Sequence, residues 1–165
     1  MNALKLLETQ HREVEDLFEK FESAGENARK TKERLCAQIA DALAIHAEIE
    51  EKIFYPESNE AVDDVEDLLR EAVEEHLSVK RVLADLLGSG VDDEQFDARM
   101  KVLKEQIEHH VEEEEEELFP KVRKALDEET LEEMGSRMET MAEELESQGE
   151  PSKQIPDQTD QPAPI

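Results

Sequence analysis

Apolar residues recur at intervals of three and four along most of the chain, the spacing that places side chains on one face of an α-helix. Residues that stop or bend helices divide this pattern into four long segments. These residues are Gly25 and Asn27, then Pro56, then Gly88 and Gly90, and finally Pro120. Because short turns favour antiparallel neighbours, the pattern predicts an all-α fold, an antiparallel up-down-up-down four-helix bundle over residues 1–127.

A fifth amphipathic stretch follows the bundle at residues 128–148. Its apolar positions again keep helical spacing, at Leu131, Met134, Met138, Met141 and Leu145. We expect an additional C-terminal amphipathic helix here, which either lies along the bundle or pairs with a second copy of the chain. From residue 149 to residue 165 the sequence turns to Pro, Gln, Asp, Ser and Thr without apolar periodicity, which predicts a disordered tail.

The composition favours a helical protein with strongly solvated outer faces. Among 165 residues there are 46 Asp and Glu against 19 Lys and Arg, giving a formal net charge of −27. This charge repels nucleic acid phosphates and anionic lipid head groups, so neither nucleic acid nor membrane is expected as a partner. The first residues lack the apolar run of a signal peptide, which indicates a cytoplasmic protein. The lone Cys36 is expected to pack as a small apolar residue.

Histidine takes core positions in all four helical segments. The second and fourth segments carry a repeated motif, HAEIEEKIFYP at 46–56 and HVEEEEEELFP at 110–120, in which Glu follows His by four residues and Pro follows His by ten. The first and third segments supply His11, which precedes its motif by 35 residues, and His76, which precedes its motif by 34. The chain therefore uses one two-helix pattern twice.

These side chains are expected to meet inside the bundle. Neighbours in an antiparallel bundle begin and end at the same level, and at 1.5 Å per residue the four core histidines lie roughly 14–18 Å from one end. A Glu four residues from a His shares its helix face. Six ligand-type side chains therefore converge, namely His11, His46, Glu50, His76, His110 and Glu114.

The six side chains predict a dinuclear metal site. Four imidazoles and two carboxylates in an apolar interior cost several kcal/mol unless a counter-charge compensates them, and a multivalent cation is the strongest compensation. Nitrogen and oxygen donors without thiolate suit iron, manganese or zinc, and six ligands are too many for one tetrahedral zinc. If each Glu bridges through both oxygens, about four positions on two octahedral metals stay open for a bridging group and an exogenous ligand.

The motifs resemble those of the hemerythrin-like HHE cation-binding family over about residues 1–127. The shared features are a core His on the first and third helices and His-x-x-x-Glu on the second and fourth. The resemblance implies terminal His ligands, with Glu50 and Glu114 bridging two iron ions (Fe2+ or Fe3+) together with an oxo or hydroxo group. The respiratory oxygen carriers of this family place another His where this chain has Lys80, which argues against oxygen storage. Lys80 itself is expected to be solvated, or else to point a proton donor toward a bound ligand.

Three further residues near the motifs are given other roles. His109 points about 100° away from its neighbour on the helix and is expected at the surface. Glu115 is the reserve ligand if the fourth helix carries a bulge, because such insertions occur at functional sites. Tyr55 is expected to pack at a helix end.

The sequence thus predicts a non-haem di-iron protein that binds, senses or handles dioxygen, nitric oxide or peroxide, or that senses iron, with manganese or zinc as alternative metals. A redox partner, or self-association through the C-terminal helix, is a further expectation. Whether the chain catalyses a reaction stays open. So do two other classes: a metal-free acidic interaction module, and a ferritin-like iron oxidase, whose Glu-x-x-His spacing occurs only at Glu8 and His11.

Overall fold

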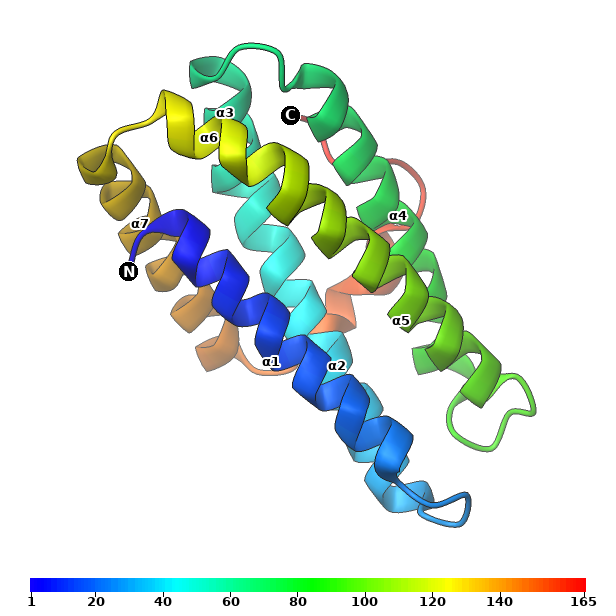
Figure 1. The fold of residues 1–165 in the computed structure, drawn as a ribbon. Coiled ribbons are helices and arrows are strands. Elements are labelled where there is room, and N and C mark those ends of the chain that lie inside the picture. The colour runs from blue at the N-terminus through cyan, green and yellow to red at the C-terminus, as the bar shows by residue number, and fades with distance from the viewer.

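The computed structural model describes residues 1–165, and its regular elements are all helical, which confirms the all-α class. The α-helices are α1 (Ala3–Ser23), α2 (Arg29–Ile49), α3 (Tyr55–Ala61), α4 (Glu66–Ser89), α5 (Phe96–Glu113), α6 (Phe119–Ala125) and α7 (Glu128–Gln148). In Figure 1, α1 and α2 lie side by side and are joined by a short turn, and α4 and α5 form a second such pair. No helix combines the length and the apolar character needed to cross a membrane.

Two π-helical turns carry the chain through the prolines that were expected to end or kink helices. The turn η1 (Glu50–Phe54) joins α2 to α3, and η2 (Glu114–Leu118) joins α5 to α6. In each turn the residue before the proline donates its N–H to the carbonyl oxygen of the Glu five residues earlier. The two bonds run from Tyr55 to Glu50 and from Phe119 to Glu114. Each proline then falls at the start of the next helix, where a missing N–H is tolerated. The hydrogen bonding therefore changes to the π type for one turn before Pro56 and Pro120, and the chain stays helical past both prolines.

The buried apolar side chains form two clusters with the histidines between them. One cluster of 18 residues gathers near α3, α6 and α7, and the other cluster of 17 gathers toward the α1–α2 and α4–α5 turns. On α1, for example, Leu7 belongs to the first cluster and Val14 to the second, and His11 lies between them. The core is thus divided by a polar layer at one level of the helices.

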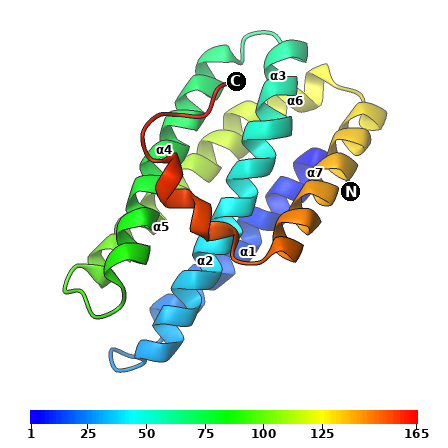
Figure 2. The ribbon, with the colours of Figure 1, turned by 180° about the vertical axis from the view of Figure 1, so that it is seen from behind.

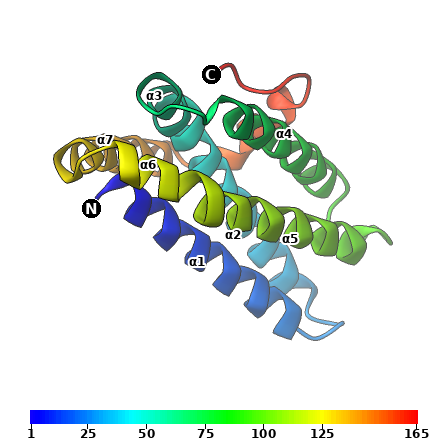
Figure 3. The same ribbon diagram turned by 45° about the horizontal axis from the view of Figure 1, so that its top comes forward.

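The fifth amphipathic stretch forms α7, which packs along α1 and α2. Its buried face includes Leu131, Met134 and Met138, so the methionine stripe serves packing. Asp127 caps the helix by accepting the N–H of Thr130. The N-terminal backbone lies against this helix (Figure 3) and approaches so closely that a Cβ at residue 135 would stand 2.1 Å from the carbonyl oxygen of Met1, which requires the glycine found there.

The C-terminal segment differs from the disordered tail expected over residues 149–165. The 3₁₀ helix η3 (Pro151–Gln158) packs on both α2 and α4, and Figure 2 shows this segment crossing from α7 over α2 to α4. Ser152 and Ile155 are buried. A single Ile in a polar segment gives no periodicity, so the sequence pattern contained no signal for this contact.

Cys36 lies in the second apolar cluster, as expected. Burial, aided by the negative charge of Glu33, raises the pKa of its thiol to about 11. Because the thiolate is the reactive form, Cys36 in the folded chain should react with iodoacetamide at pH 8 roughly 100-fold more slowly than an ordinary cysteine. Alkylation followed by mass spectrometry measures this rate, and the same thiol should react normally in guanidinium. Equal rates in folded and unfolded chain would contradict the burial.

Candidate metal centre

The structure brings all six predicted ligand residues together, in two groups that share one residue. The donor atoms of His11, His46, Glu50 and Glu114 lie within 4.8 Å of one another, and so do those of Glu50, His76 and His110. None of these six residues is more than 6% exposed. The shared member, Glu50, therefore stands where two metal ions could be held next to each other.

Each carboxylate lies between two histidines from different helices. Glu50 offers one oxygen 3.2 Å from His46 Nε2, on its own helix, and the other oxygen 3.0 Å from His76 Nε2 on α4. Glu114 repeats the arrangement, with 3.3 Å to His110 Nε2 on its own helix and 3.2 Å to His11 Nε2 on α1. A carboxylate whose two oxygens face different imidazoles has the geometry of a bridging ligand.

The Nδ1 atom of every core histidine is held by a side chain outside the predicted set. Distances from Nδ1 to the partner oxygen run from 2.7 to 3.0 Å, and the pairs are His11–Glu115, His46–Gln10, His76–Glu51 and His110–Glu75. Such bonds fix the ring orientation and leave Nε2 free to face inward. The partners also follow the sequence repeat. Glu51 and Glu115 directly follow Glu50 and Glu114, and Gln10 and Glu75 directly precede His11 and His76.

Four buried polar atoms in the first group lack a hydrogen bond of good geometry, although each His Nε2 among them lies 3.2 Å from a carboxylate oxygen. They are His11 Nε2, His46 Nε2, Glu50 Oε1 and Glu114 Oε2. An unsatisfied buried polar atom costs about 1–3 kcal/mol, and more when it is charged. All four atoms belong to the group whose ligand atoms lie within 4.8 Å of one another, and each can offer an electron pair to a cation. The residues present therefore fit a metal ion at this place.

Tyr55 was expected to pack at a helix end, but its hydroxyl lies at the second group. It donates to Glu114 Oε1 at 2.5 Å, stands 3.0 Å from Glu50 Oε2, and lies 3.1 and 3.4 Å from the Nε2 atoms of His76 and His110. The cause is the π turn, because its extra residue rotates the fifth position after Glu50 onto the inward face. Reasoning with straight α-helices placed this side chain elsewhere.

The corresponding position in the second half of the repeat is Phe119, which directly precedes Pro120 as Tyr55 precedes Pro56. Its ring stacks on His11 with centroids 5.9 Å apart. The π turns thus show that Phe119 matches Tyr55 and not Phe54. The two halves differ here by one hydroxyl, which makes the two metal-ligand groups chemically unequal.

The ionisable groups hold each other in charged forms. Burial lowers the pKa of His110, but the Glu114 and Glu50 carboxylates raise it well above its ordinary value. For Glu114, burial and the charge of Glu50 raise the pKa, but His110 and His11 outweigh them and bring it to about 2. Metal binding at Nε2 must displace protons from such imidazoles, so metal affinity should fall as pH falls.

Lys80 is not the solvated side chain expected from sequence. It is 7% exposed, and its Nζ atom lies 2.8 and 2.9 Å from the two oxygens of Glu51. Glu51 in turn holds His76 Nδ1. Because two buried charges neutralise each other here, Lys80 positions the carboxylate that orients one ligand histidine.

The remaining predicted residues lie outside the centre. His109 is at the surface as expected, with its side chain 61% exposed and paired with Glu75 and Glu113. Glu115, the reserve ligand, holds His11 Nδ1. Glu8, which the ferritin-like alternative needs as a ligand beside His11, turns toward Arg123 at 3.3 Å, so nothing in the site supports that alternative.

Comparison with known proteins agrees with this architecture. Residues 2–122 match the family described as the Hemerythrin HHE cation binding domain. The chain is also similar to the crystal structure of a hemerythrin HHE cation binding domain-containing protein from Mycobacterium kansasii, with 26% sequence identity, 90% of this chain and 89% of that chain covered, and a TM-score of 0.77. No curated protein matched the chain. Since the family match spans most of the sequence, the chain belongs to the hemerythrin HHE cation-binding family.

Proposed function

We propose that this protein holds two iron ions and uses them to bind or handle a small ligand such as dioxygen, nitric oxide or peroxide. The observation that carries the proposal is the pair of donor groups sharing Glu50, one of which has four buried atoms without hydrogen bonds of good geometry. The arrangement of the helices further supports an up-down-up-down bundle of four long helices, with α7 as the additional C-terminal helix.

The donor set suits iron or manganese better than zinc. Four imidazoles and two carboxylates, without thiolate, suit iron and also manganese, whereas zinc prefers a closed set of four ligands. A pair of iron ions would supply redox chemistry and open coordination positions for a small ligand. The six side chains offer too few donor atoms to fill two octahedral metals, so the protein itself leaves space for that ligand.

The surrounding side chains have distinct tasks in this proposal. The four Nδ1 partners fix the imidazole rings, and the Lys80–Glu51 pair fixes His76 most firmly because it is itself buried. Tyr55 holds a proton on its hydroxyl, since burial together with the charges of Glu114 and Glu50 raises its pKa well above the ordinary value. This hydroxyl lies beside His76 and His110 and also contacts the two carboxylates, Glu50 and Glu114.

Anaerobic loading with ferrous iron, followed by metal analysis and an absorption spectrum after exposure to air, tests the proposal. We expect about two irons per chain and new near-ultraviolet absorption. A folded helical chain that takes up no iron would overturn it, and uptake of zinc or manganese alone would reassign the metal.

Replacing Tyr55 by Phe should destabilise the metal-free protein. The variant Tyr55→Phe keeps the ring but removes a hydroxyl that contacts four donor atoms, leaving the Glu114 carboxylate without its donor at 2.5 Å. We expect a loss of about 1–3 kcal/mol in the free energy of unfolding. Urea denaturation of the metal-free chains measures the difference. Unchanged stability would mean that the hydroxyl is not held by the carboxylates.

A further inference from the structure

A small internal cavity adjoins the proposed metal centre. Its volume is about 20 Å³, enough for roughly one water-sized molecule. Three ligand histidines line it, His46, His76 and His110, and Lys80 also contributes to the wall. The rest of the wall is apolar side chains of α2, α4, α5 and η3. The cavity is therefore a space beside three of the predicted ligands in which a small exogenous ligand could be accommodated.

One wall of this cavity comes from outside the residues that match the family. Ile155, on η3, lines the cavity although the family match ends at residue 122. Its side chain is 2% exposed and belongs to the second apolar cluster. The segment beyond the helical domain thus contributes directly to the surroundings of the ligand histidines.

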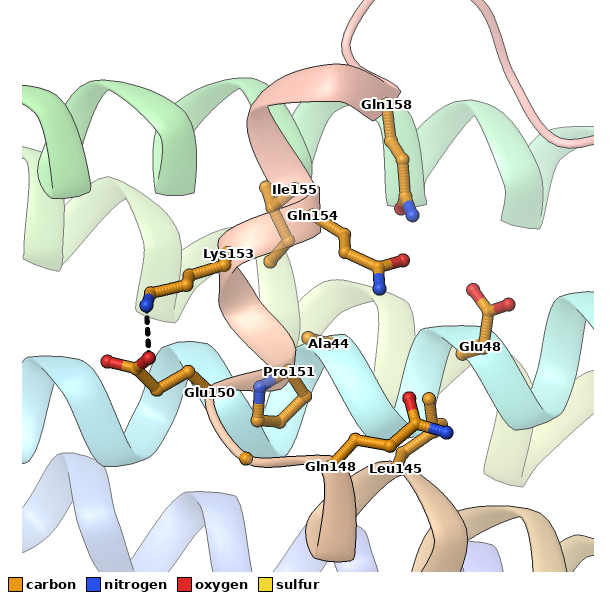
Figure 4. Close-up of a pocket in the computed structure, with 11 residues that line it drawn as sticks. Ala44, Glu48, Leu145, Gln148, Glu150, Pro151, Lys153, Gln154, Ile155 and Gln158 are labelled. Carbon is orange, nitrogen blue, oxygen red and sulfur yellow. Dashed lines mark ion pairs between the residues drawn. The ribbon is translucent and has the colours of Figure 1, made fainter.

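Ile155 also belongs to the lining of a second pocket. Together with Ala44 it lines a larger open pocket of about 280 Å³ on the outer side, between α2, the end of α7 and η3. Figure 4 shows this pocket, with Pro151 close to Ala44 on α2 and Gln158 further along the segment toward α4. The same side chain therefore has the internal cavity on one side and an open pocket on the other.

Two hydrogen bonds tie the segment across the helices. The N–H of Ser152 donates to Asp41 Oδ1 on α2 at 3.0 Å, and Arg81 Nε on α4 donates to the carbonyl oxygen of Thr159 at 3.0 Å. Ile155 lies between these two attachment points. The segment is therefore held by these two hydrogen bonds and by the burial of Ile155 between them.

We propose that Ile155 controls access to the metal centre and restricts it to small molecules of about two heavy atoms, such as dioxygen or nitric oxide. This inference rests on the proposed function for its choice of ligand. The size limit follows from the small volume of the cavity. Ile155 thereby sets the ligand class of the site.

Tyr55 makes the access measurable without any metal. It is the only Tyr in a chain without Trp, it is buried, and its hydroxyl touches two of the histidines that line the cavity. Quenching of its fluorescence by acrylamide, in the metal-free full-length chain, therefore reports access to the centre. Acrylamide is too large for the cavity, so we expect weak quenching in the parent protein.

The variant Ile155→Ala should raise the acrylamide quenching constant by about 5-fold or more, because the internal cavity would merge with the outer pocket. Asp41→Ala, which removes one attachment of the segment and leaves the core side chains in place, should raise it in the same direction. Gln154→Ala, an exposed neighbour on η3, is the matched control and should not change it. Circular dichroism establishes that each variant is folded.

The ligand class is tested on the iron-loaded chain with nitric oxide and azide as probes. We expect Ile155→Ala to accelerate azide binding more than nitric oxide binding. Strong quenching of the parent protein, or no increase in Ile155→Ala and Asp41→Ala, would overturn the role of Ile155, and equal acceleration of both probes would overturn the selectivity. The quenching result does not depend on metal, so a chain that takes up no iron but shows these quenching changes would refute the proposed function alone.

Discussion

Loading the metal-free protein with ferrous iron should raise its unfolding midpoint by roughly 15–30 °C. Each ion that binds only the folded chain adds about 4 kcal/mol when its free concentration is about 1,000 times its dissociation constant. For a domain of this size, 1 kcal/mol shifts the midpoint by about 2–4 °C. The shift is large because the ligands are already assembled, and buried atoms such as Glu50 Oε1 exchange an unsatisfied state for a bond to the metal.

Anaerobic thermal unfolding followed by circular dichroism measures this shift. The variant His109→Ala is the matched control, because it removes an imidazole that is exposed and outside both buried groups, and it should keep the full shift. The replacement His110→Ala should lose a large part of it. A midpoint that rises by less than about 2 °C in the parent protein would mean that iron does not bind the buried side chains.

Replacing Glu50 by Ala should abolish binding of both metal ions, a larger loss than any histidine replacement. Glu50 is the one residue that belongs to both buried groups, and its two oxygens face His46 and His76. Without it, the first group keeps three ligand residues and the second keeps only two histidines. We therefore expect iron content to fall from about two per chain to well below one.

Metal analysis of Glu50→Ala beside two other variants gives this comparison. His11→Ala removes a member of the first group only and should retain the second ion more strongly than Glu50→Ala does. Glu116→Ala removes an exposed carboxylate two residues beyond Glu114 and should bind iron as the parent protein does. If Glu50→Ala and His11→Ala lose the same amount of iron, the shared role of Glu50 is wrong.

The ligand residues were predictable because their spacing is regular. A His and a Glu four residues apart share one helix face in any α-helix, and both copies of the motif obey this rule. In the structure, His46 lies in α2 and Glu50 is the first residue of the π turn, so both precede the extra residue that alters the register. The convergence of all six side chains therefore needed only straight helices and short turns.

The features that the sequence did not predict follow the start of the π turns or depend on contacts between residues far apart in the sequence. Tyr55 faces the centre because η1 inserts a residue, and Pro56 was interpreted as a helix end for the same reason. Lys80 on α4 pairs with Glu51 on η1, and this pair can be recognised only when the relative position of the two elements is known. Ile155 is a single apolar residue in a polar segment, and only the packing of η3 on α2 and α4 gives it a role.

The central claim is that two adjacent metal ions share Glu50, and an anomalous difference map from a crystal of the iron-loaded protein tests it most directly. The account predicts two peaks, one among His11, His46, Glu50 and Glu114 and the other among Glu50, His76 and His110. A single peak in the interior would contradict the dinuclear claim. So would iron found only at the surface group of Glu71, Glu75, His109 and Glu113.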